Sequence, residues 1–136
     1  MDDFFKSLLR GNTEIPDEAF SVALMKFCPE AVSVEWYIDG SIHEAFFLKH
    51  GQEKIARFSE DVRLMDIKTN LHINRVPEDI RKKIEVSGEI MSSILISGDQ
   101  VYRFEFVVRD KNMKREIIFT GEEGQILHRK NFPEII

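Results

Sequence analysis

Four histidines, one cysteine and two pairs of acids are the side chains of this chain that could do chemistry. The histidines are His43, His50, His72 and His128. None of them has the HxH or HxxxH spacing that brings two imidazoles to one metal ion. Cys28 is the only cysteine, so a CxxC site and an intrachain disulfide are both excluded. We therefore expect neither a metal nor a cofactor.

Two pairs of adjacent acids could supply a general acid and a general base. Asp17 and Glu18 follow a proline in the segment IPDEAF, and Glu78 and Asp79 follow a proline in VPEDIR. A proline is well tolerated at the start of a helix, and carboxylates there are stabilised by the helix dipole. This structural role explains both pairs, so we predict no catalytic residues and no enzyme activity.

The same two prolines begin two copies of one pattern. Each copy, residues 14–72 and residues 75–132, has an amphipathic helix and then four strands separated by turns rich in Gly, Asn or Asp. The strands are expected at 31–38, 41–49, 53–58 and 62–68, and again at 89–96, 100–108, 115–119 and 125–129. A short helix over Asp2–Arg10 precedes the first copy.

This pattern predicts an α+β fold in a single domain of residues 1–136. Connections of hairpin length make consecutive strands antiparallel neighbours. A tandem α-β-β-β-β repeat therefore forms one antiparallel eight-stranded sheet with the helices on one face.

Composition restricts the partners. The chain has 136 residues and a net charge of −5. All of the acidic excess lies in residues 1–74, with 8 basic and 13 acidic residues. This balance argues against nucleic acid and against an anionic membrane surface. No apolar run is long enough to cross a membrane, and the N-terminus lacks the basic residues of a signal peptide. Taken literally, the chain stays in the cytoplasm, although a processed protein expressed with an added Met would look the same.

Four segments carry a resemblance to a known family. They are IPDEAF, FCPEAVSVEW, VYRFEF and FTGEEGQIL, spread over residues 14–132. In order and doubling they resemble the PepSY-like family, bacterial envelope proteins with the fold of the β-lactamase inhibitor protein (BLIP). The resemblance implies a periplasmic or envelope location and binding or inhibition through the sheet. The chain departs from the family in two places: His43 stands where the second copy has Tyr102, and Gly124 has no counterpart in the first copy.

Strand alternation indicates which side of the sheet is open. In the second copy one side holds Tyr102, Phe104, Phe106 and Val108, and the other holds Val101, Arg103, Glu105 and Val107. The charged residues mark the second side as the open face. The same register in the first copy turns His43, Ala45 and Phe47 inward. Trp36, in phase with Val32, Val34 and Ile38, is expected in the core.

We expect a partner to bind on this open face. The predicted contact residues are Tyr37, Ile42, Phe46, Leu48, Val101, Arg103 and Val107, with a rim of Glu35, Glu44 and Glu105. Apolar residues with a charged rim are typical of protein interfaces. The partner is another protein, such as an enzyme that is inhibited, or a second copy of this chain. If the sheet curls or the N-terminal helix folds across it, Phe46 and Leu48 are buried instead. The alternative function is a carrier that holds a small apolar ligand between sheet and helices.

Overall fold

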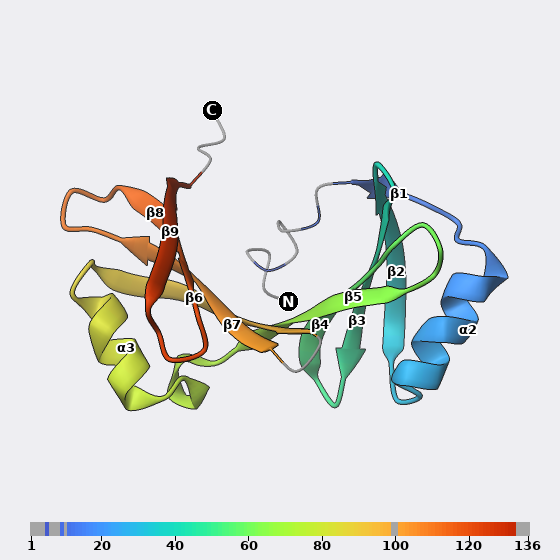
Figure 1. The fold of residues 1–136 in the computed structure, drawn as a ribbon, viewed down its shortest axis with the longest axis horizontal. Helices are drawn as coiled ribbons and strands as arrows, with labels where there is room; N and C mark the ends of the chain where they lie inside the picture. Colours follow the sequence, from blue (N-terminus) through green and yellow to red (C-terminus); the bar gives the residue numbers. More distant parts are fainter. Residues whose placement is uncertain (1–4, 6–8, 10, 99–100, 133–136) are drawn as a thin grey trace. The chain divides into compact units, whose positions relative to one another are not determined.

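The computed structural model of this chain describes residues 5, 9, 11–98 and 101–132 (Figure 1). The described strands follow the sheet order β1 to β9, which is the order of the sequence, and their class is α+β with an antiparallel sheet, as predicted. The chain divides into two compact units, Met1–Thr69 and Asn70–Ile136. Most of the helix predicted over Asp2–Arg10 falls outside the described residues.

The elements match the predicted pattern closely. The first part of the chain contains β1 (Asn12–Thr13), α2 (Glu18–Phe27), β2 (Val32–Asp39), β3 (Ile42–Lys49), β4 (Gln52–Phe58) and β5 (Leu64–Leu71). The second part contains η1 (Ile73–Arg75), α3 (Glu78–Glu85), β6 (Glu89–Gly98), β7 (Val101–Arg109), β8 (Arg115–Thr120) and β9 (Ile126–Asn131). Only β1 was not predicted among the described strands, because a two-residue strand shows no alternation.

In the first unit α2 packs on one face of the strands (Figure 1). The buried cluster there consists of Phe20, Leu24, Cys28, Ala31, Ala45, Phe47, Ala56, Phe58 and Ile67. Phe20 meets Trp36 edge to face, with ring centroids 6.1 Å apart. Trp36 is partly buried against this cluster, as expected. Aromatic side chains therefore fill the space between α2 and the sheet.

A β-bulge in β2 changes the face of one predicted core residue. Ser33 has a φ of 55°, and the register with β3 shifts between Val32 and Glu35. One extra residue in a strand reverses the alternation beyond it. Val32 consequently pairs with Leu48 and is exposed, whereas the prediction had placed it inward with Trp36.

In the second unit α3 contributes Ile80 and Ile84 to a separate core. Phe104 and Phe106 of β7 stack there with ring centroids 5.7 Å apart. α3 ends at Glu85, and Gly88 follows in the turn before β6 with a φ of 149°, where a Cβ would lie 2.4 Å from the carbonyl oxygen of Arg109.

The turns after β4 and β8 are equivalent. In the first unit the Ser59 N–H donates to the Arg63 carbonyl at 2.8 Å, and the Val62 N–H donates to the Ser59 carbonyl at 3.0 Å. In the second unit Gly121, Gly124 and Gln125 repeat both hydrogen bonds, at 2.9 and 3.1 Å. Val62 therefore takes the place of Gly124, and both have positive φ, 62° and 83°.

This equivalence corrects the alignment of His43. Phe58 and Thr120 each directly precede one of the two equivalent turns. Phe58 pairs with His43, and Thr120 pairs with Phe104. His43 thus corresponds to Phe104 rather than to Tyr102. The β7–β8 hairpin is longer than the β3–β4 hairpin by fewer residues than the comparison of the two sequence copies assumed.

Candidate protein-binding surface

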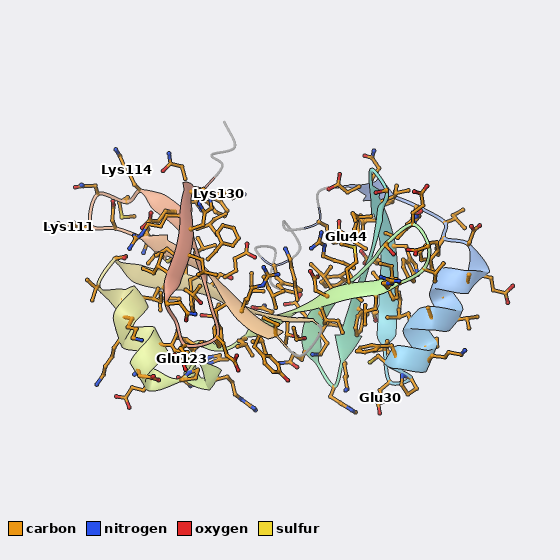
Figure 2. All side chains as sticks on the ribbon, in the orientation of Figure 1. Glu30, Glu44, Lys111, Lys114, Glu123 and Lys130 are labelled. Atoms are coloured by element: carbon orange, nitrogen blue, oxygen red, sulfur yellow. The ribbon has the colours of Figure 1, made fainter. Side chains whose placement is uncertain are left out.

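On the side of the first unit away from α2, charged side chains form a row across three strands. The register pairs Glu44 with Arg57 and Arg57 with Asp66. Arg57 donates from Nη1 to Asp66 Oδ2 at 3.0 Å, and its Nε lies 4.0 Å from Glu44 Oε2. Glu44, labelled in Figure 2, extends from β3 on that side and is buried. An arginine held between two carboxylates keeps these charges in fixed positions.

The predicted contact residues of the first unit lie around this row with different exposure. Tyr37, Ile42 and Leu48 are partly exposed. Tyr37 donates its hydroxyl proton to Glu35 Oε2 at 2.6 Å. Phe46 is only 1% exposed, and the ring of Phe5 lies 6.2 Å from it. Phe46 is therefore buried, which is the alternative that the sequence analysis considered for this face.

The predicted contact residues of the second unit separate in the same way. Val107 is 1% exposed, whereas Val101 is 54% exposed and Arg103 is also exposed. Tyr102, which the alternation placed inward, is 48% exposed. We call Val101, Tyr102 and Arg103 the β7 patch.

Strand lengths explain why the β7 patch is exposed. The first residue of β7 that pairs with β8 is Phe104, opposite Thr120. The three residues before it pair with β6 alone. They extend past the end of β8, so both sides of the strand meet solvent there. The signal was present in the sequence, because the predicted β7 segment is several residues longer than the predicted β8 segment.

His43 contacts Glu14 and Phe20 and has a structural role. Its Nδ1 lies 2.7 Å from Glu14 Oε1, and its ring stacks on Phe20 with centroids 4.1 Å apart. Glu14 also donates its backbone N–H to the Trp36 carbonyl at 3.0 Å. These contacts attach the segment before α2 to the sheet, and they place His43 on the α2 side with Ala45 and Phe47, as predicted.

The fold lowers the pKa values of two charged groups, Lys54 and Asp61. Burial lowers the pKa of Lys54, nearby Lys49 lowers it further, and Cys28 opposes both effects. The Lys54 ammonium group donates to Thr69 Oγ1 at 2.9 Å. At the turn after β4, the Ser59 hydroxyl donates to Asp61, and this hydrogen bond is the main cause that lowers the pKa of Asp61.

The described residues contain no cluster of three or more His, Cys, Asp or Glu side chains that could hold a metal ion. Two surface cavities, of about 390 and 490 Å³, both border Ile73 and Arg81 beside α3. Their linings mix charged and apolar residues. The larger cavity is lined by Arg81 and Glu85 of α3 and by Glu89 and Ile90 of β6. Within the described part of the chain, no helix is long and apolar enough to cross a membrane.

Solved structures share this architecture over most of their length. A BLIP-like protein from Bacteroides fragilis superposes with a TM-score of 0.74 and 22% identity, over 87% of each chain. A DUF2874 family protein from Bacteroides uniformis has a TM-score of 0.80 and 19% identity, over 86% of this chain and 90% of that one. Another from Bacteroides ovatus has a TM-score of 0.78 and 17% identity, over 87% and 89%.

The chain has a BLIP-like fold. No family model and no curated protein matches it. The expected fold of the β-lactamase inhibitor protein is thereby confirmed, while membership of the PepSY-like family remains a resemblance.

Proposed function

We propose that this chain is a protein-binding module without catalytic activity and that the β7 patch is part of its binding surface. The observation that carries the proposal is the exposure of Val101, Tyr102 and Arg103 beyond the end of β8. Tyrosine and arginine are the residue types that most often dominate the binding energy of protein interfaces. Because Val101, Tyr102 and Arg103 already pair with β6, little backbone ordering is needed when they bind a partner.

A second group of partly exposed residues, in the first unit, also supports the proposal. Tyr37, Ile42 and Leu48 are partly exposed beside the row formed by Glu44, Arg57 and Asp66. Apolar contacts supply affinity, and the partly exposed charges of Arg57 and Asp66, which are already held in place, select a complementary partner without further ordering. An enzyme whose surface is complementary to these charges is one such partner, and inhibition would follow if the chain covered its active site.

The exposure of the predicted residues decides which substitutions can test this function. Phe46 and Val107 are buried, so a charge at either position would unfold the chain rather than block a partner. Tyr102 is exposed and can be replaced by a photoreactive phenylalanine derivative. Val86, exposed beside α3, is a matched control position in the same unit.

Photocrosslinking in cell and envelope extracts tests the proposal. We expect the chain with the photoreactive side chain at position 102 to form one dominant crosslinked product that contains another protein. The same group at position 86 should not form that product. Equal products from both positions, or none at position 102, would contradict binding through the β7 patch.

A further inference from the structure

The two helices at equivalent places in the two units have different outer surfaces. On α3 the outer residues are charged and pair along the helix, with Glu78 3.1 Å from Lys82 and Arg81 3.5 Å from Glu85. Such pairs are typical of a helix that faces water. On α2 the centre of the outer surface is apolar, because Val22 is 48% exposed and Met25 is 45% exposed.

The exposed side of α2 forms one continuous stripe. Its residues are Glu18, Ala19, Val22, Met25 and Lys26. Their spacing of three, four and seven residues places them on the same side of a helix. The opposite side holds Phe20 and Leu24, which are buried against the sheet. α2 is therefore apolar on both its inner and its outer side, an arrangement typical of a helix that is covered on both sides.

We propose that the outer stripe of α2 binds the same stripe of a second copy of this chain, with the two helices antiparallel about a two-fold axis at Val22. The proposal does not depend on the β7 patch. Along α2 the stripe begins with an acid, continues through a small residue and two larger apolar residues, and ends with a base. Such an order is complementary to itself when one copy is reversed.

The antiparallel register brings unlike residues together. Counted from Val22, Glu18 lies as far toward the N-terminus as Lys26 lies toward the C-terminus. Each Glu18 consequently meets Lys26 of the second copy. Ala19 and Met25 are likewise three residues from Val22 on either side, so a small side chain receives a large one. A parallel pair would instead place Glu18 against Glu18 and Lys26 against Lys26.

Ile15, just before α2, is 98% exposed. In the antiparallel pair the N-terminal end of one helix lies beside the C-terminal end of the other, so Ile15 lies near the C-terminal end of the second copy's helix. Phe27 is exposed too, but it lies seven residues after Phe20 and therefore on the sheet side of α2. A ten-residue helix covers less than the roughly 1,600 Å² of a standard interface, so we expect a weak, reversible dimer.

Sedimentation equilibrium measures this association directly. For the wild type, the mean mass should rise from the monomer mass of 15.9 kDa toward twice that value as concentration increases. A range of about 5 to 500 µM covers the affinity of weak interfaces. Val22→Glu should remain monomeric, because it places two carboxylates at the axis. All substituted positions are exposed, and far-ultraviolet circular dichroism would show that each variant keeps its fold.

Charge exchange distinguishes this pairing from other contacts. Glu18→Lys and Lys26→Glu should each weaken association by roughly tenfold or more, because like charges then meet across the axis. A mixture of the two single variants should associate, and so should the double variant Glu18→Lys/Lys26→Glu. A wild type that stays monomeric over the whole range would overturn the proposal. It would also be overturned if the single variants associated as well as the wild type, or if the mixture showed no recovery.

Discussion

At the level of single residues, backbone strain is concentrated in the hairpin turns. Met113, in the turn between β7 and β8, has a φ of 65° and an exposed side chain. The left-handed region costs a non-glycine residue about 1–2 kcal/mol. Because the Met113 side chain is 65% exposed and little packing is lost with it, Met113→Gly should raise the free energy of unfolding by about 0.5–1 kcal/mol. Urea unfolding monitored by circular dichroism measures this change.

Lys111 in the same turn is the matched control. Its φ is not positive, so glycine there only adds freedom to the unfolded chain. Lys111→Gly should therefore lower the free energy of unfolding. Equal effects of the two substitutions would show that Met113 is not strained.

Lys54 provides a prediction on pH. Burial lowers its pKa in the folded state, so the unfolded chain binds this proton more tightly than the folded chain does. The cost to stability is present below the folded pKa and disappears as the pH rises to the ordinary lysine value of about 10.4. As the pH rises from neutral toward the ordinary lysine value of about 10.4, the wild type should gain stability relative to Lys54→Gln. Urea unfolding of both proteins at several pH values tests this, and a difference that stays constant or falls would contradict it.

At the level of elements, Gly124 allows the β8–β9 turn to pack closely against α3. Gly124 has a φ of 83°, and an added Cβ would lie 3.0 Å from Cγ1 of Ile80. Gly124→Ala should therefore cost about 2 kcal/mol, from strain together with displacement of Ile80. Gly40 has a φ of 61° with open space around it, so Gly40→Ala should cost only about 1 kcal/mol. Thermal unfolding of both variants measures the difference, and equal costs would mean that the contact with Ile80 is unimportant.

An element could be predicted well from the sequence where the residues that cause it are neighbours in the chain. Prolines, glycines and alternation fixed both helices and the eight predicted strands within a few residues, because these signals act on neighbouring residues. The bulge at Ser33 could not be predicted, since it depends on the register with β3. Exposure was predicted least well. Phe46 and Tyr102 exchanged their expected environments, because burial depends on Phe5 in one case and on the length of β8 in the other.

At the level of the whole molecule, two units with one plan have cores that are filled differently. In the first unit Trp36 on β2 pairs with Ala45 on β3. In the second unit Ser93 on β6 pairs with Phe106 on β7. Each pair contains one large and one small side chain, but the large one lies on the first strand of the pair in one unit and on the second strand in the other. The two pairs therefore fill similar volumes. The repeat therefore preserves the architecture while the two units keep different side chains and different surfaces.

The most direct test of the proposed function is the affinity of the protein crosslinked at position 102 for three forms of the chain. We predict that Arg103→Glu weakens binding by roughly tenfold or more relative to the wild type, because the charge of an interface arginine is reversed. Val86→Glu should bind as tightly as the wild type, because Val86 is exposed outside the β7 patch. Equal affinities for all three forms would contradict the role of the β7 patch as a binding surface.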